Sequence, residues 1–112
     1  MSVEAARFVV VLVTAGSAEE GRRIGHAMVE ERLAACVNVV GPIRSIYRWE
    51  GAVEEADEHL LVMKARAADV PALTGRVRAL HSYDVPEVVA LPLIGGSEGY
   101  LAWLAAATDR AG

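Results

Sequence analysis

CVNVVGPIRSIYRWEGAVEEADEHLLVMKA, residues 36–65, is the stretch that decides the fold. It predicts two strands, 36–49 and 52–65, joined by a tight turn at Glu50-Gly51. Gly41-Pro42 interrupts the first strand, and proline cannot donate to a sheet ladder, so we expect a bulge or an edge position there. The stretch therefore predicts one long β-hairpin.

The hairpin is too long for the body that carries it. Each arm has about 14 residues, which span ~45 Å at ~3.3 Å per residue. A compact chain of this length has a radius of gyration of only ~13 Å. The tip must therefore project and leave Tyr47 and Trp49 in water in a monomer. Because long exposed strand edges favour aggregation, we expect copies of the chain to pair there, as a homo-oligomer.

The segment before the hairpin predicts a strand and a helix. Phe8–Thr14 is a continuous, mostly β-branched run, which is typical of a strand covered on both faces. Ser17 and Glu20 have the spacing of a capping box, so we expect a helix from about 17 to 34.

The segment after the hairpin predicts a second helix that begins at Asp69, with Pro71 in its first turn. Its apolar face is expected to carry Val70, Leu73, Val77 and Leu80. The remaining elements are a polar loop at 81–87, a short strand at 88–91 closed by Pro92, and a last helix after residue 97. This order predicts an α+β, ferredoxin-like βαββαβ sandwich with an extra C-terminal helix.

Composition narrows the class of protein. The chain has 112 residues and 11.9 kDa, so we expect one domain over residues 1–112. Its net charge of −4 argues against nucleic-acid binding, and its single cysteine excludes an internal disulfide framework. The apolar run at 8–13 is too short for a signal peptide or a membrane span, so we expect no membrane association and a cytoplasmic location.

Three separated blocks resemble the CutA family of divalent-cation tolerance proteins. They are ERLAACVN at 31–38, IYRWEG at 46–51, and HSYDVPE at 81–87, together with Tyr100, Leu101, Trp103 and Leu104. The resemblance implies a trimer of ferredoxin-like subunits held together by strand pairing between neighbours. It also implies a link to copper and other divalent cations, and the trimer shape resembles that of PII signalling proteins.

His81 is the strongest candidate metal ligand. A neutral imidazole suits Cu(II) or Zn(II), although His81 could instead cap the helix before it. The resemblance implies a copper site made of a cysteine late in the first strand and two adjacent histidines. Val13 and Leu80 stand at two of those places, so only His81 of that set remains.

Two further polar residues have alternative roles. Cys36 is the only soft ligand available; we place it with the residues of an intersubunit cleft, and within that assignment we favour a packing role for it. Lys64 closes an apolar run, so it is either an ordinary strand end or an ammonium in a cleft, paired with Glu87 or receiving an anion.

Aromatic and acidic residues suggest a cleft between subunits. Tyr47, Trp49 and Tyr83 could line it, although Trp49 favours simple packing between subunits. Asp84 and Glu87 share the polar loop with Tyr83.

The acidic residues of the hairpin suit a different role. Five of them, Glu50, Glu54, Glu55, Asp57 and Glu58, fit no calcium loop, so we expect solvated and salt-bridged arms. A two-residue turn at the tip places Asp57 opposite Arg44.

Three functions are therefore open. The first is a non-enzymatic trimer that binds copper or another divalent cation and contributes to cation tolerance. The second is a PII-like sensor or scaffold whose intersubunit cleft binds a small anionic metabolite. The third, which we rank lowest, is an enzyme that uses His81, Tyr83 and Glu87 for acid–base chemistry.

Overall fold

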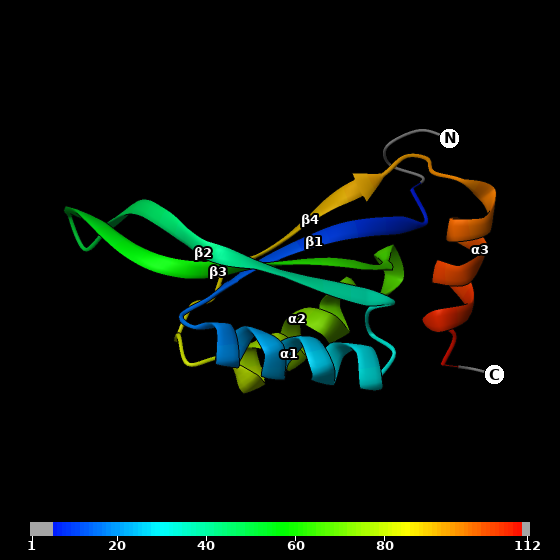
Figure 1. The fold of residues 1–112 in the computed structure, drawn as a ribbon, viewed down its shortest axis with the longest axis horizontal. Helices are drawn as coiled ribbons and strands as arrows, with labels where there is room; N and C mark the ends of the chain where they lie inside the picture. The colour runs from blue at the N-terminus through cyan, green and yellow to red at the C-terminus, as the bar shows by residue number, and fades with distance from the viewer. Residues whose placement is uncertain (1–5, 111–112) are drawn as a thin grey trace.

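The computed structural model describes residues 6–110, and Figure 1 shows a twisted sheet with two helices beneath it. The elements are β1 (Phe8–Ala15), α1 (Ala18–Glu30), β2 (Cys36–Trp49), β3 (Ala52–Arg66), a 3₁₀ turn (Ala67–Asp69), α2 (Val70–Leu80), β4 (Val88–Leu93) and α3 (Glu98–Ala107). That 1–112 form one domain stays a prediction, and its ends, 1–5 and 111–112, lie outside the described residues.

The sheet is antiparallel, with the strand order β2-β3-β1-β4. This order and the βαββαβ succession confirm the predicted α+β, ferredoxin-like architecture, with α3 as the additional helix. The two outer strands, β2 and β4, leave one open edge on each side of the sheet.

Side chains alternate across the sheet: α1 and α2 cover one face, and α3 covers only the end of the opposite face, at Phe8 and Cys36. The core joins the helix-facing residues of β1 and β3 to α1 and α2; it includes Val9, Val11, Val13, Ile24, Met28, Leu61, Met63, Leu73 and Val77. Each fully buried side chain of this kind contributes ~1.5–3 kcal/mol. Val40, Val89 and Leu91 project from the opposite face and are 46%, 46% and 49% exposed, so an apolar part of this face is left without a cover.

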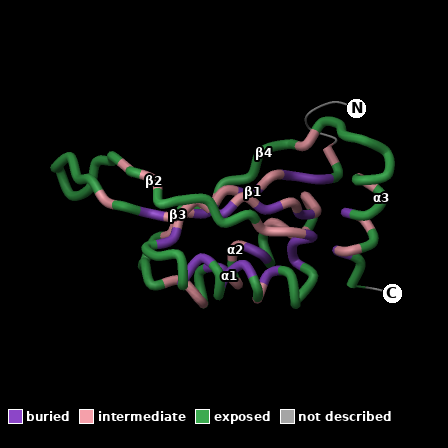
Figure 2. Tube along the Cα trace, viewed as in Figure 1, coloured by how far each residue is buried: buried purple, intermediate pink, exposed green. Residues whose placement is uncertain are grey.

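The hairpin projects as predicted. The chain measures 44 Å along its longest axis, and the end of the hairpin is its most exposed part (Figures 1 and 2). Glu50 and Gly51 have φ values of 49° and 81°, which a type I′ turn requires at both central positions. Arg44 lies opposite Asp57 with Nη1 and Oδ1 3.0 Å apart, and the register shifts between Val40 and Ile43 at the interruption. All three features confirm the sequence analysis.

Helix α1 ends earlier than expected, at Glu30 rather than near residue 34. Arg32 has a φ of 58°, and it donates its N–H to the carbonyl of Val29. Leu33 donates to the carbonyl of Met28, which completes a Schellman motif. The left-handed conformation of Arg32 ends the helix. An arginine therefore occupies the C-terminal position where glycine is usual.

Strand β4 continues through Pro92 to Leu93, whereas the sequence analysis ended the strand before this proline. Pro92 pairs in register with Val9 of β1. An outer strand has one side without a partner, so a residue that lacks an N–H is tolerated there.

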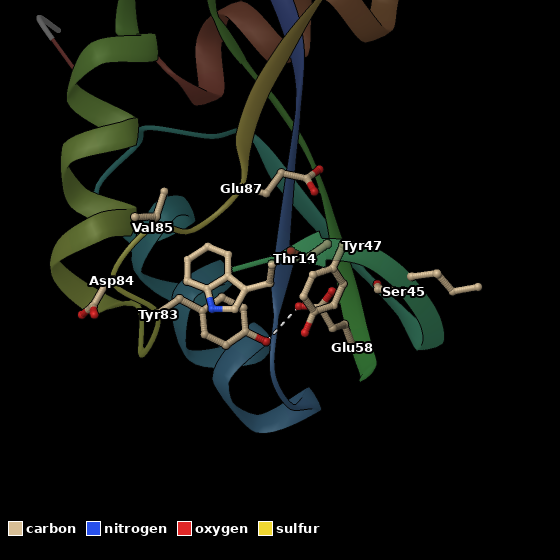
Figure 3. Close-up of a pocket in the computed structure, with 10 residues that line it drawn as sticks. Thr14, Ser45, Tyr47, Glu58, Tyr83, Asp84, Val85 and Glu87 are labelled. Carbon is tan, nitrogen blue, oxygen red and sulfur yellow. Dashed lines mark hydrogen bonds between the residues drawn. The ribbon is translucent and has the colours of Figure 1, made fainter. Parts of the chain in front are cut away.

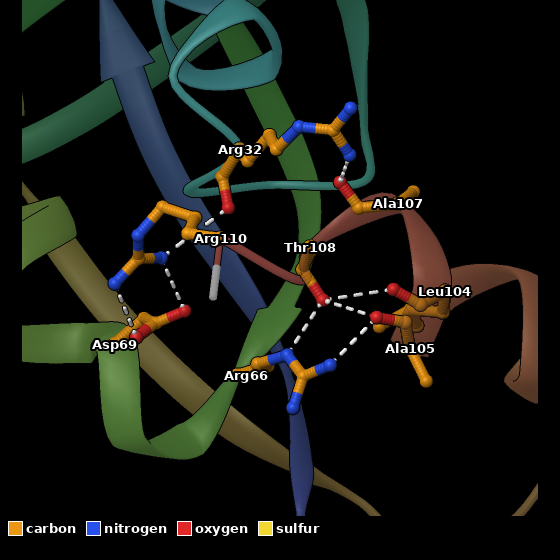
Figure 4. A network of polar contacts seen from close by, with 8 residues as sticks. All are labelled: Arg32, Arg66, Asp69, Leu104, Ala105, Ala107, Thr108 and Arg110. Atoms are coloured by element: carbon orange, nitrogen blue, oxygen red, sulfur yellow. Dashed lines mark hydrogen bonds and ion pairs between the residues drawn. The ribbon is translucent and has the colours of Figure 1, made fainter. Parts of the chain in front are cut away.

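A polar network attaches α3 to the rest of the molecule (Figure 4). Arg66 donates from Nε to the hydroxyl of Thr108 at 2.8 Å and from Nη2 to the carbonyl of Ala105 at 2.6 Å. Arg110 forms a bidentate pair with Asp69. Because Phe8, Ala35 and Leu104 form a small second core beside this network, α3 is packed against the body rather than merely appended.

Candidate functional site

A cleft of about 560 Å³ lies where the hairpin meets the loop between α2 and β4 (Figure 3). Its lining consists of Thr14, Ser45, Ile46, Tyr47, Trp49, Glu58, Tyr83, Asp84, Val85 and Glu87. Strand alternation explains the hairpin's share, because Ser45, Tyr47 and Trp49 lie two residues apart on one face of β2. The cleft has the volume of a small-molecule site.

Glu58 lies at the base of the cleft and is only 7% exposed. Its Oε2 accepts a hydrogen bond from the Tyr83 hydroxyl at 2.8 Å (Figure 3). Burial, this hydrogen bond and the nearby negative charge raise the pKa of Tyr83 to about 12, so the phenol is neutral and donates. Glu58 makes no ion pair with a basic residue among residues 6–110, and its Oε1 has no hydrogen-bond partner there. It is therefore a largely buried carboxyl group with no basic partner within the described range 6–110.

His81 holds the loop that carries Tyr83. Its Nε2 lies 2.7 Å from the carbonyl oxygen of Thr14, and its Nδ1 accepts from the backbone N–H of Tyr83 at 3.0 Å. These partners require the neutral imidazole with its proton on Nε2. The side chain is fully buried, so both ring nitrogens are engaged inside the protein.

Glu20 fixes the same loop from the first turn of α1. Its Oε1 accepts from the N–H of Gly16 at 3.0 Å, and its Oε2 accepts from the N–H of Ser82 at 2.7 Å. Burial alone would raise the pKa of this carboxyl, but the hydrogen bonds from Ser82 and Gly16 outweigh burial and lower it. Glu20 is therefore ionised at neutral pH and binds the loop through charge-assisted hydrogen bonds.

The charged side chains that line the cleft are all acidic. Three carboxylates, those of Glu58, Asp84 and Glu87, line it, and its described lining contains no Lys, Arg or His. The remaining lining is aromatic, hydroxylated or aliphatic, with Tyr47 43% and Trp49 53% exposed. Such a surface attracts a cation and repels an anion.

The structure brings together five of the residues assigned to a cleft by sequence, namely Tyr47, Trp49, Tyr83, Asp84 and Glu87. Cys36 and Lys64 do not line it. They lie opposite each other in the β2–β3 register, where Lys64 donates to the side chain of Asn38 at 3.1 Å and Cys36 lies 3.5 Å from the Tyr100 hydroxyl. Whether the cleft lies between subunits stays a prediction.

The residues present do not form a tight site for the metal that the resemblance implies. Val13 is fully buried in the core and Leu80 packs against it, so neither position offers a ligand. Metal binding by His81 stays a prediction, and it requires the loss of one of the two hydrogen bonds of the ring. No group of three His, Cys, Asp or Glu side chains within residues 6–110 is arranged to hold a metal ion.

Sequence reasoning missed two acidic residues of this site. Glu58 was expected to be solvated with its neighbours on the hairpin, and that expectation is wrong for Glu58 because it lies under the Tyr83 loop. Glu20 was expected to return a hydrogen bond to Ser17. Only the reverse bond forms, from the Glu20 N–H to the Ser17 hydroxyl, while the carboxylate binds Gly16 and Ser82. No local signal marks either residue, because both roles depend on the distant 81–87 loop.

The fold and the cleft together define a ferredoxin-like α+β protein with a long hairpin and an acidic, aromatic binding cleft at the base of that hairpin. The chain belongs to the CutA1 divalent ion tolerance protein family, whose profile matches residues 9–107. The family resemblance seen in the sequence is thereby confirmed.

Individual relatives agree in sequence and in fold. The divalent-cation tolerance protein CutA of Thermus thermophilus is 55% identical over 95 residues, which are 85% of this chain and 92% of that protein. A solved structure from that organism superposes with a TM-score of 0.89 at 52% identity and covers 91% of this chain and 99% of its own. CutA1 of Oryza sativa superposes with a TM-score of 0.90 at 45% identity over 98% of this chain and 100% of its own.

Relatives differ in length and in the compartment that their names state. The chloroplastic CutA of Arabidopsis thaliana is 50% identical over 86% of this chain, which spans about half (53%) of that protein. An Archaeoglobus fulgidus relative of solved structure is described as periplasmic. No helix within residues 6–110 is long and apolar enough to cross a bilayer. The cytoplasmic location stays a prediction.

Proposed function

We propose that this chain is a non-enzymatic, homotrimeric protein that contributes to divalent-cation tolerance by binding cations in the acidic cleft. One observation carries the proposal: Glu58 is a buried carboxylate without a basic partner among the described residues, in a cleft whose lining adds two carboxylates and no basic group. Burying an unpaired charge is costly, and a bound cation would offset that cost.

Oxygen ligands dominate the cleft, so it suits hard, hydrated divalent cations better than copper. Because the carboxylates do not converge on one point, we expect the ion to keep part of its water shell and to bind weakly. The same charges disfavour the PII-like alternative, an anionic metabolite, in the cleft of a single chain. A copper site at His81 is the competing location.

The trimer is supported by the two open edges and the uncovered apolar part of the sheet. Because β2 and β4 are different edges of one sheet, pairing β2 of one copy with β4 of the next is head-to-tail and can close a ring. Such pairing would also bury part of the apolar face that carries Val40, Val89 and Leu91.

Calorimetric titration with Mn(II), Cu(II) and inorganic phosphate tests the cation site. In the wild type we expect saturable Mn(II) binding that weakens about tenfold in Glu58→Gln, because one charge is lost. The exposed Glu30→Gln variant serves as the control. Cu(II) binding with imidazole nitrogen couplings in its electron paramagnetic resonance spectrum, lost in His81→Ala, would move the metal to His81. Phosphate binding without metal binding would overturn the proposal in favour of the anion alternative.

Sedimentation velocity tests the assembly. We expect a trimer that Val40→Lys disrupts, whereas Val29→Lys, on α1 with a similar exposure of 42%, leaves it intact. A monomeric wild type would contradict the proposed trimer.

A further inference from the structure

The aromatic lining of the cleft restricts the kind of cation that fits best. Tyr47, Trp49 and Tyr83 all line it, and in the single chain each is more than a third exposed (43%, 53% and 37%) although each carries a large apolar ring. A bare or hydrated metal ion leaves such rings in water. An organic cation covers them with its carbon atoms and meets their faces with its charge.

The acidic part of the cleft suits the charged end of such an organic cation. Glu58 offers one solvent-accessible oxygen, Oε1, that has no hydrogen-bond partner among residues 6–110. Its other oxygen and its orientation are fixed by Tyr83 (Figure 3). A single fixed carboxylate oxygen is sufficient for an ammonium N–H donor. Tight binding of a metal ion needs several converging ligands, which the described side chains do not provide.

We infer that the cleft is a binding site for an organic ammonium compound, a protonated amine with an apolar or aromatic body, whose charge meets Glu58 and whose body lies against Tyr47 and Trp49. This rests on the proposed function in one respect, namely that the cleft accepts cations. The cleft volume of about 560 Å³ suits a molecule of metabolite size.

Three probes with one ring and different charges test the ligand class: benzylamine, which is a cation at neutral pH, benzyl alcohol, which is neutral, and benzoate, which is an anion. The chain contains two tryptophans, so the Trp103→Leu variant leaves Trp49 as the only fluorophore of its kind. Trp103 lies on α3 outside the cleft lining. We expect benzylamine to change the Trp49 emission saturably and to bind about tenfold more tightly than benzyl alcohol. We expect no saturable change with benzoate.

Three further variants, made in the Trp103→Leu background, assign the site. Glu58→Gln should remove the preference for benzylamine over benzyl alcohol, and Glu30→Gln should leave it unchanged. Tyr47→Leu should weaken benzylamine binding about fivefold by removing an aromatic face. It also keeps the test decisive if Glu58→Gln does not fold. Equal affinity for amine and alcohol, or tighter binding of benzoate, would overturn the inference.

Parallel Mn(II) titration separates this inference from the proposed function. If Mn(II) binds in a Glu58-dependent manner and benzylamine does not bind, the inference fails and the divalent-cation site stands. If benzylamine binds and Mn(II) does not, the inference stands and the divalent-cation function fails. If neither cation binds, both are overturned.

Discussion

The phenol oxygen of Tyr83 lies 2.8 Å from Oε2 of Glu58 and joins the 81–87 loop to the base of the hairpin. The two residues are 25 positions apart in sequence and belong to separate elements. Their hydrogen bond lies at the floor of the cleft, and within residues 6–110 it is the only hydrogen bond to the Glu58 side chain, a residue that is 7% exposed. The burial of the Glu58 carboxylate therefore depends in part on this contact, while His81 and Glu20 hold the rest of the loop.

Removing this hydrogen bond should destabilise the protein. We expect Tyr83→Phe to lower the free energy of unfolding by ~1–3 kcal/mol, because it leaves a buried carboxylate unsatisfied. The measurement is the denaturant midpoint with its slope. Tyr47→Phe is the matched control, since it removes the same atom from another tyrosine of the cleft whose hydroxyl has no hydrogen bond within residues 6–110. Equal effects of the two variants would show that the Tyr83–Glu58 bond contributes nothing.

Stability should also fall in alkaline solution for the same reason. The folded-state pKa of Tyr83 is raised by burial and by the Glu58 carboxylate to about 12, against 10.0 for an ordinary tyrosine. A raised pKa means that the contribution is complete below pH 10.0 and is lost as the pH rises toward 12. The difference in unfolding free energy between the wild type and Tyr83→Phe should therefore shrink over that interval. A difference that stays constant through it would contradict the assignment.

The two-residue turn at the hairpin tip gives a prediction with an internal control. Gly51 has a φ of 81° with open space around it, so Gly51→Ala should lower the denaturant midpoint, at a cost of ~1 kcal/mol, by backbone strain alone. Gly75 lies inside α2 and is equally free of neighbours, so the same change there should stabilise by ~0.5–1 kcal/mol. The same sign for both variants would refute the argument.

The hairpin shows which features are predictable from sequence. Its turn, its interruption and the pairing of Arg44 with Asp57 follow from local chemistry: a turn residue pair, a proline, and the counting of residues back from the tip. The end of α1 does not follow in this way. Arg32 adopts a conformation that its side chain disfavours, because the chain must turn there to place Leu33 in the core.

The site was predictable only in part, because its residues come from segments that tertiary structure brings together. The aromatic and loop residues are unusual types for their segments, and the sequence analysis could therefore single them out. Glu58 is one of five acidic residues in the hairpin. Only its tertiary contact with Tyr83 distinguishes it from the other four. Metal binding by His81 stays a prediction, and the sequence did not indicate the hydrogen bonds by which its ring holds the loop in place.

Glu20 should contribute to stability through the loop that it binds. We expect Glu20→Gln to lower the free energy of unfolding at neutral pH by ~1–3 kcal/mol, because an amide nitrogen would meet the N–H of Ser82 or Gly16. Glu19→Gln is the matched control, since it removes the same charge from the same first helical turn but from an exposed side chain. A comparable loss in both variants would assign the effect to the helix dipole instead.

The dependence of stability on pH in acid solution tests the role of Glu20 independently. Burial would raise the pKa of Glu20, but the hydrogen bonds from Ser82 and Gly16 lower it below the ordinary value of 4.5. A lowered folded-state pKa gives stability that is complete above 4.5 and is lost as the pH falls through the folded value. The gap between wild type and Glu20→Gln should therefore be constant near neutrality and close in acid, as measured by denaturant unfolding at a series of pH values. A gap that widens in acid would mean that the carboxylate is strained rather than stabilised, and that the loop over the cleft is held by His81 alone.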